Sequence, residues 1–236
     1  MLLSIIIPVF NEEKSIGILI EKLLKLDFSK INFDREIIVV NDGSKDGSRK
    51  IIEKFEGIQV INQENFGKGK AVQNGIEKAK GKFILIQDGD LEYNPEDILS
   101  MCSATMNFDK VSVYGSRYKP LYLNLIPKFN KNQNFLSYLA NILFMFLFMF
   151  LYIRFITDPL TGYKLYQRDF YLENVIHSKG FEADHEITAK LIRQKFKIIE
   201  IPISYKPRTR REGKKINFFD AIKAMLTIIK YRFINK

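Results

Sequence analysis

Residues 83–92 have the sequence FILIQDGDLE, in which four apolar residues are followed at once by a run with three acidic side chains. Short apolar runs bounded by turn residues are typical of strands buried in a parallel sheet. The same arrangement occurs twice earlier in the chain, in LLSIIIPVFNEE (2–13) and in EIIVVNDGS (36–44). We therefore predict a buried strand at the start of each segment, with polar residues at its carboxyl end.

The segments between these strands carry apolar residues at helical spacing, as in Ile16, Leu19, Ile20 and Leu23. The same kind of pattern predicts further strands at 58–61 and 111–114, and helices near 51–55, 67–79 and 95–106. Alternating strands and helices predict an α/β fold with a Rossmann-like, mostly parallel sheet and helices on both faces. In such sheets, ligands bind beyond the carboxyl ends of the strands.

Acidic residues therefore gather at one edge of the predicted sheet. They would repel one another unless positive charge lay between them, and Mg²⁺ or Mn²⁺ commonly binds through one or two carboxylates together with substrate phosphates. Asp88 and Asp90, with Gly89 between them, can direct both carboxylates at one ion that neutralises a diphosphate. Single residues also have plainer interpretations, because Asn11 could cap a helix and Asp42 could belong to an ordinary turn.

The chain has 236 residues and a net charge of +10, and its length fits one domain or one domain with an appendage. Residues 190–236 carry fourteen Lys and Arg against three Asp and Glu, whereas residues 1–189 are close to neutral. This basic region predicts an anionic partner, which could be a membrane surface, nucleic acid or a phosphate-bearing substrate. Cys102 is the only cysteine, and the start of the chain has no basic n-region, so we expect a cytosolic setting and no signal peptide.

Residues 142–153 form an unbroken run of twelve apolar side chains between Asn141 and Arg154. A membrane-spanning helix needs about 20 such residues, so the run by itself is too short to span. A buried core helix, a helix in the membrane interface and a dimer interface all fit the pattern, and the scarcity of polar residues favours the membrane interface. A final helix over 217–233 has an apolar side and scattered basic residues, which is also found in helices on membrane surfaces.

Seven ordered motifs give the chain a resemblance to a known family. They are PVFNEE (8–13), VNDGSKDGS (40–48), GKGKAVQNG (67–75), QDGDLE (87–92), GSRY (115–118), DPLTGYK (158–164) and IPISYKPRTRREGKK (201–215). The first four resemble those of family 2 inverting glycosyltransferases with the GT-A fold. The last three resemble the branch of that family that includes dolichyl- and polyprenyl-phosphate mannose and glucose synthases.

The resemblance implies a set of site residues. Those expected to bind the nucleotide sugar are Pro8, Phe10, Asn11, Glu12, Asp42, Lys70, Asp88, Arg117, Arg208 and Lys214. Asp88, Asp90 and Glu92 are implied as ligands of Mg²⁺ or Mn²⁺, although some relatives have a glutamine where this chain has Glu92. Asp90, Asp158 and Arg117 are implied in catalysis. Arginine suits the phosphate contacts because its planar guanidinium can bind two oxygens at once.

The role of Asp158 depends on the acceptor. A lipid phosphate is already ionised at neutral pH, since its second pKa lies near 6, and it can attack without a base, so Asp158 would then orient the acceptor or the sugar. A lipid hydroxyl must lose a proton, so Asp158 would then serve as general base. A plain cap before Pro159 is the structural alternative. Asp184 is expected to be the N-cap of the next helix, and His185 to lie at the surface or behind the site.

Taken together, we expect a GT-A enzyme with membrane-interface helices. Its parts would be a nucleotide-sugar-binding half (1–118), apolar interface helices (119–157), an acceptor-side part with the basic loop (158–216) and a basic amphipathic helix (217–236). It would move a hexose from a UDP- or GDP-linked sugar to a polyprenyl or dolichyl phosphate at the cytoplasmic membrane face. Attachment would be peripheral on anionic lipid, or through a membrane partner. A homo-oligomer is a further candidate assembly.

Three other functions are weighed against this one. Transfer to a lipid hydroxyl such as diacylglycerol keeps the chemistry and changes the acceptor. A sugar nucleotidyltransferase would need a glycine-rich phosphate loop after the first strand, where Pro8–Glu13 is acidic instead. A basic nucleic-acid-binding module would make no use of Asp88 and Asp90, so no nucleic acid is expected as partner.

Overall fold

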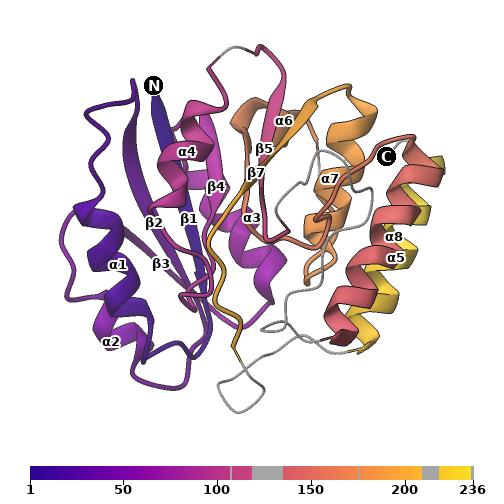
Figure 1. Ribbon diagram of the computed structural model, residues 1–236. Helices are drawn as coiled ribbons and strands as arrows, with labels where there is room; N and C mark the ends of the chain where they lie inside the picture. Colours follow the sequence, from indigo (N-terminus) through magenta and orange to yellow (C-terminus); the bar gives the residue numbers. More distant parts are fainter. Residues whose placement is uncertain (107, 119–134, 175, 209–217, 235–236) are drawn as a thin grey trace.

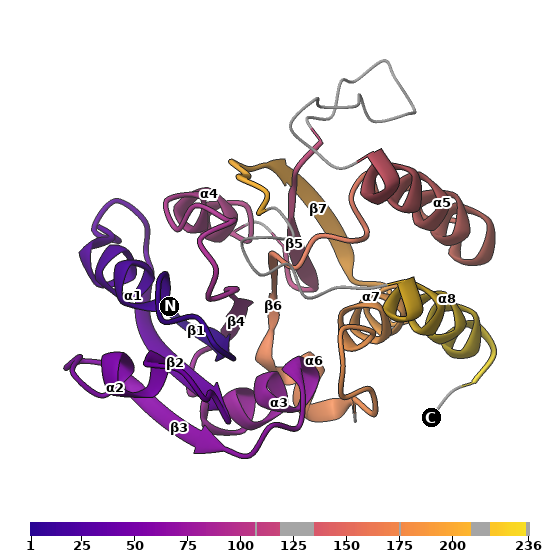
Figure 2. The same ribbon diagram turned by 90° about the horizontal axis from the view of Figure 1, so that it is seen from below.

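The computed structural model of the protein describes residues 1–106, 108–118, 135–174, 176–208 and 218–234. They form a seven-stranded sheet with helices packed on both faces (Figures 1 and 2). The strands are β1 (Leu2–Val9), β2 (Asp34–Asp42), β3 (Gln59–Gln63), β4 (Phe83–Ile86), β5 (Val111–Ser116), β6 (Lys164–Gln167) and β7 (Lys197–Pro202). The helices are α1 (Ile16–Lys25), α2 (Ser48–Ile52), α3 (Lys68–Lys78), α4 (Asp97–Ser103), α5 (Phe135–Tyr152), α6 (Arg168–Glu173), α7 (Ala183–Arg193) and α8 (Phe218–Phe233).

The strands follow the order β3-β2-β1-β4-β6-β5-β7 across the sheet. All neighbours are parallel except β6, which is antiparallel to β4 and to β5. The prediction of a mostly parallel sheet with flanking helices is therefore confirmed. Strand β6 was not predicted, because four residues that begin with a lysine and end with a glutamine give no readable apolar pattern. It brings the segment after Asp158 into the middle of the sheet.

The sheet divides the core into two layers, which explains the unbroken apolar run of β1. Leu3, Ile5 and Ile7 face the layer covered by α1, α2 and α4, while Ile6 faces the layer covered by α3, α5, α7 and α8. Successive side chains of a strand point to opposite faces, so a strand covered on both faces must be apolar throughout. Figure 2 shows the two helix layers on either side of the sheet.

Helix α5 is longer than the predicted run 142–153, since it begins at Phe135. Ser137 and Asn141 break the apolar pattern before residue 142, but they do not interrupt the helix. The resulting 18 residues are long and apolar enough, by length and composition, to cross a membrane, with 28% of them buried. The run 142–153 alone is too short to span a membrane, whereas the whole helix α5 is long enough by length and composition.

The same helix has a buried side and an exposed side. Phe144 and Phe148 lie in the core, and the Tyr152 hydroxyl donates to the Ile228 carbonyl of α8 at 2.7 Å. Helices α5 and α8 lie side by side at one end of the molecule (Figures 1 and 2). Large apolar side chains remain exposed on this pair and just beyond it, among them Leu136, Leu143, Phe150, Ile153, Phe219 and Phe233.

Candidate functional site

Three carboxylates meet where β1 and β4 end. These two strands are parallel neighbours, so their carboxyl ends reach the same edge of the sheet. Glu12 follows β1, and Asp88 and Asp90 follow β4, with the whole group largely withdrawn from solvent. We call Glu12, Asp88 and Asp90 the carboxylate edge.

Two cations from distant parts of the chain contact the carboxylate edge. Arg208, which follows β7, places Nη1 2.8 Å from Glu12 Oε2 and Nη2 2.9 Å from Asp90 Oδ2. Lys68, the first residue of α3, places Nζ 2.8 Å from Asp88 Oδ1. The same ammonium lies 3.5 Å from Asp184 Oδ2, so Lys68 is shared between two carboxylates.

The carboxylate edge is short of positive charge. Burial, together with the charges of Asp88 and Glu92, raises the pKa of Asp90 to about 7, although Arg208 acts in the opposite direction. Burial opposes the charge on Lys68, yet Asp184 and Asp88 raise its pKa above the ordinary value. A carboxyl group that is hard to ionise beside two others indicates that a further cation would be well accommodated here.

A hard divalent ion fits this donor set. Among the residues that the structure describes, no group of three or more His, Cys, Asp or Glu side chains is placed to hold a metal on its own. Mg²⁺ and Mn²⁺ commonly use one or two carboxylates and take their remaining ligands from phosphate and water, and Asp88 and Asp90 match that pattern. Glu92 is engaged elsewhere, because its two oxygens accept from the Tyr205 hydroxyl at 2.8 Å and the Arg208 N–H at 2.7 Å.

A second charged group lies at the end of β5. Asp158, fully buried, accepts from Arg117 Nε at 2.8 Å, Nη2 at 2.7 Å and the backbone N–H at 2.9 Å. The guanidinium also lies over the rings of Tyr118 and Tyr205, 5.8 and 5.1 Å from their centroids. Burial would lower the pKa of Arg117, but Asp158 holds it well above the ordinary value. We call Arg117 and Asp158 the arginine corner.

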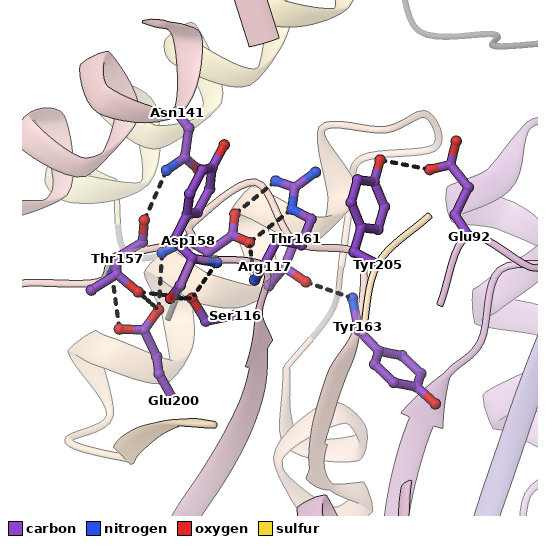
Figure 3. Close-up of polar contacts among 12 residues, drawn as sticks. Glu92, Ser116, Arg117, Asn141, Thr157, Asp158, Thr161, Tyr163, Glu200 and Tyr205 are labelled. Atoms are coloured by element: carbon purple, nitrogen blue, oxygen red, sulfur yellow. Dashed lines mark hydrogen bonds and ion pairs between the residues drawn. The ribbon is translucent and has the colours of Figure 1, made fainter. Parts of the chain in front are cut away.

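The arginine corner leaves one side of the guanidinium available. Both Nε and Nη2 are used by Asp158, and none of the described residues accepts a hydrogen bond from Nη1 of Arg117. Figure 3 shows Asp158 against one edge of the guanidinium, with the other terminal nitrogen directed away from it. A planar cation held by one edge can bind two oxygens of an anion, or one oxygen of it, through the other edge.

The turns after the first two strands are joined to one another through Asn11. Asn11, with a φ of 54°, accepts the Lys45 N–H at 2.8 Å and donates its own N–H to Ser44 at 3.0 Å. Asn11 therefore ties together the turns after β1 and β2, and the N-cap position of α1 belongs to Ser15. Pro8 lies near the end of β1, and Phe10 directly follows that strand.

Asp42 stabilises the entrance to α3. Its Oδ1 accepts from Gln63 Nε2 at 2.7 Å and from the Phe66 N–H at 2.9 Å, and its Oδ2 accepts the Gly67 N–H at 3.0 Å. Gly67 has a φ of 94°, a conformation that glycine adopts without strain. The next residue is Lys68, so this loop sets the start of the helix that delivers Lys68 to the carboxylate edge.

Some expectations from the sequence are corrected by the structure. Asp184 is not the N-cap of α7, a position that Glu182 occupies; Asp184 lies in the first turn and faces Lys68. His185 is buried, with its ring 5.3 Å from that of Phe144. The basic-loop residue Lys214 lies outside the described residues.

Sequence reasoning also missed residues at this site. It selected Lys70, which is half-buried on α3, whereas the ammonium that reaches Asp88 belongs to Lys68. Both lysines occur in the same GKGK motif. The sequence therefore indicated a lysine at this position in the fold, but it did not show which of the two side chains points toward Asp88. Lys164 was also passed over; it is fully buried, and burial lowers its pKa to about 8.

Comparison with known proteins places the chain in a family. The family model described as glycosyl transferase family 2 matches residues 4–173. An uncharacterized protein of Methanocaldococcus jannaschii is 32% identical over 210 residues, which covers 84% of this chain and 86% of that protein. Dodecaprenyl-phosphate galacturonate synthase of Rhizobium johnstonii is 34% identical over 141 residues, covering 55% of this chain and only 41% of the synthase.

A solved structure shares the fold at low sequence identity. It is glucosyl-3-phosphoglycerate synthase of Mycobacterium tuberculosis, in complex with Mn²⁺, UDP and phosphoglyceric acid. The TM-score is 0.71 at 17% identity, and the match covers 99% of this chain and 79% of that one. The fold, the strand-end carboxylates and the matched family model agree with the resemblance seen in the motifs. The chain belongs to glycosyl transferase family 2, and it is a glycosyltransferase.

Proposed function

We propose that this glycosyltransferase moves one hexose from a nucleotide-diphosphate sugar to a polyprenyl phosphate, with inversion at the anomeric carbon. The proposal rests on the presence of two sites, the carboxylate edge and the arginine corner, at the same edge of the sheet. The carboxylate edge lacks positive charge, and the arginine corner has an unused donor edge. A metal-bound diphosphate suits the first and an anionic acceptor suits the second. The similarity to a dodecaprenyl-phosphate galacturonate synthase supports the choice of acceptor.

The donor would lie across the ends of β1, β2 and β4. In this proposal Pro8, Phe10 and Asn11 contact the base and ribose together with Glu12 and Asp42, and Lys70 and Lys214 assist at the phosphates. Asp88 and Asp90 would hold Mg²⁺ or Mn²⁺, with Glu92 as a further candidate ligand. The bound ion would neutralise charge on the departing diphosphate.

The cations already at the edge have a second task in the proposed complex. Lys68 and Arg208 balance carboxylates in the structure, at 2.8 and 2.9 Å. Once a divalent ion balances Asp88 and Asp90, the two side chains are free to bind phosphate oxygens instead. The backbone N–H of Arg208 donates to Glu92 at 2.7 Å, so the guanidinium can turn while the backbone stays at the site.

The acceptor phosphate would bind the open edge of Arg117. One of its oxygens attacks the anomeric carbon from the side opposite the diphosphate, forming a C–O bond as the bond to the diphosphate breaks. Because the phosphate is already ionised, no proton needs to be removed. Asp158 is then an anchor for Arg117 rather than a base, in agreement with three hydrogen bonds that already occupy its carboxylate.

The membrane surface is the proposed location of the acceptor. Exposed apolar side chains on α5 and α8 include Phe150 at 76% and Phe233 at 75% exposure, where a soluble surface would normally be polar. Lys230 and Arg232 lie on α8 in the same part of the molecule, and basic groups are attracted to anionic headgroups. We propose that this helix pair rests on the cytoplasmic face of the membrane as a peripheral contact.

A donor and acceptor screen tests the proposed function. Purified protein is incubated with labelled UDP- and GDP-hexoses, with Mg²⁺ or Mn²⁺, and with polyprenyl phosphate or diacylglycerol in vesicles. The expected result is label in the organic phase with polyprenyl phosphate, lost on adding a chelator. Label transferred to diacylglycerol would replace the phosphate acceptor by a hydroxyl, and no transfer from any donor would reject the proposal.

A further inference from the structure

Asp158 lies in a segment without regular structure, between α5 and β6. A functional side chain on such a segment needs other groups to fix its position, because no helix or strand does so. The short stretch Ile156–Asp158 is nonetheless tied on several sides, and Figure 3 shows the polar groups that converge on it. These groups come from β7, α5 and β5, so the stretch connects three elements of the fold, and we call it the junction.

Glu200, on the edge strand β7, makes the largest contribution to this junction. Its Oε1 accepts from the Asp158 N–H at 2.9 Å and from Thr157 Oγ1 at 2.8 Å, and its Oε2 accepts the Thr157 N–H at 2.8 Å. On the same face of β7, Ile198 packs against the apolar core. A half-buried carboxylate beside such a position is costly unless it is hydrogen-bonded, and burial raises the pKa of Glu200.

Thr157 is also held from two other directions. Asn141, fully buried on α5, donates its Nδ2 to the Thr157 carbonyl at 2.8 Å. Ser116, the last residue of β5, lies 2.9 Å from Thr157 through their hydroxyl groups. The backbone N–H, backbone carbonyl and hydroxyl of Thr157 are therefore all engaged, by β7, α5 and β5.

These contacts form a continuous chain to the guanidinium. Glu200 fixes the backbone of Thr157 and Asp158, Asp158 grips Arg117, and Arg117 directly follows the strand that ends at Ser116. A shift of the Asp158 backbone would turn the carboxylate and with it the open edge of Arg117. Misplacement of a binding group by about 1 Å can reduce the rate by about 100-fold.

We propose that Glu200 is a positioning residue for acceptor binding: it sets the direction of Arg117 through Thr157 and Asp158, without touching the substrate. The inference rests on the proposed function for the meaning of Arg117. The orientation of Arg117 can also be measured without any reaction, so this part can be tested independently of the activity.

The main variant is Glu200→Gln, which keeps the shape and removes the charge and one acceptor. Glu36 provides the matched control, because it too is half-buried and accepts two backbone N–H groups and one hydroxyl, from Lys80, Gly81 and Ser4. It lies at the opposite ends of the strands from the site. Glu36→Gln should therefore reproduce any loss of stability without an effect on Arg117.

Glu200→Gln is expected to lower kcat/KM for polyprenyl phosphate by about 10- to 100-fold. The affinity for nucleotide with Mn²⁺, measured by calorimetry, should stay within about twofold of the parent value, because the carboxylate edge is unchanged. Glu36→Gln should change neither quantity. Equal losses of acceptor efficiency and nucleotide affinity, or no difference between the two variants, would overturn the inference.

A second readout separates this inference from the proposed function. The Arg117 Nε–H, assigned by its loss in Arg117→Lys, should give a slowly exchanging NMR signal in the parent protein and a shifted or broadened one in Glu200→Gln. An unchanged signal would reject the positioning role even if the protein transferred no sugar. If Glu200→Gln does not fold, Thr157→Val should show the same signal change, and Thr157→Ser, which keeps the hydroxyl contacts, should not.

Discussion

The carboxylate edge and the arginine corner are built from the same kinds of side chain but differ in charge balance. At the edge, Glu12, Asp88 and Asp90 face Lys68 and Arg208, and Lys68 is shared with a further carboxylate. At the corner, one arginine meets one aspartate with three hydrogen bonds. The edge therefore has a place for added positive charge, whereas the corner is complete and presents a fixed cation.

This difference suggests a division of tasks. An incomplete group of carboxylates can change its partners when a metal-bound diphosphate arrives. A buried arginine whose charge is balanced by one aspartate cannot, because removing that aspartate would leave an uncompensated charge inside the protein. The edge is suited to binding and release of the nucleotide, and the corner to holding an acceptor in one orientation. Substitutions in and around the two regions test this division.

The largest effect is expected from Asp90→Asn. If Asp90 holds the proposed ion, its loss removes charge stabilisation of the departing diphosphate that is worth several kcal/mol, so kcat should fall by about 1,000-fold or more. The measurement is sugar transfer against Mn²⁺ concentration, with Glu21→Gln, an exposed change on α1, as control. Transfer that keeps its rate and its metal dependence would remove Asp90 from the site.

Arg117→Lys should have the next largest effect. Lysine cannot contact both oxygens of Asp158 and still present a planar edge, so acceptor efficiency should fall by about 100-fold while nucleotide affinity stays constant. The matching change at the other region, Arg208→Lys, should do the reverse and weaken nucleotide binding by about tenfold. If both variants lose acceptor and nucleotide binding equally, the two regions do not act separately.

A smaller effect is expected at the exposed side of α5. Phe150→Ser should reduce binding to vesicles of anionic lipid by about tenfold, since burying a phenylalanine side chain is worth about 1.5–3 kcal/mol. Ile18→Ser, at an exposed apolar residue on α1, is the control and should bind like the parent protein. Sedimentation with vesicles provides the measurement, and equal binding of both variants would argue against this contact surface.

The last expected effect is on stability rather than on activity, and it concerns Lys164, which is buried among charges of both regions. Burial lowers its pKa from 10.5 to about 8, so between these values the unfolded chain binds more protons than the folded one. Stability should therefore rise with pH across this window, by about 3 kcal/mol at most. Lys164→Met should abolish this contribution, as urea unfolding of both proteins at several pH values would show. Parallel pH profiles would contradict the assignment.

The sequence predicted the strand ends of β1, β2 and β4 better than the surroundings of Asp158. Apolar strands followed by Asn11, Asp42 and Asp88 predicted the positions of three strand ends. This was possible because strand and turn formation depends on residues that are close together in the sequence. Glu200 gave no such signal, since a glutamate in an edge strand is usually solvated. Its three acceptor contacts appear only when β7 is placed beside β5.

What the sequence by itself determined is the mostly parallel sheet, its two buried faces and the acidic character of the edge where β1, β2 and β4 end. An unbroken apolar strand is stable only when both faces are covered, so the fold class follows from local pattern. Only the tertiary structure decided which charges meet. Arg208 reaches Glu12 across 196 positions of the chain, and Lys68 reaches Asp184 across 116. Such pairs depend on strand order and on the insertion of β6, which local residue patterns do not encode.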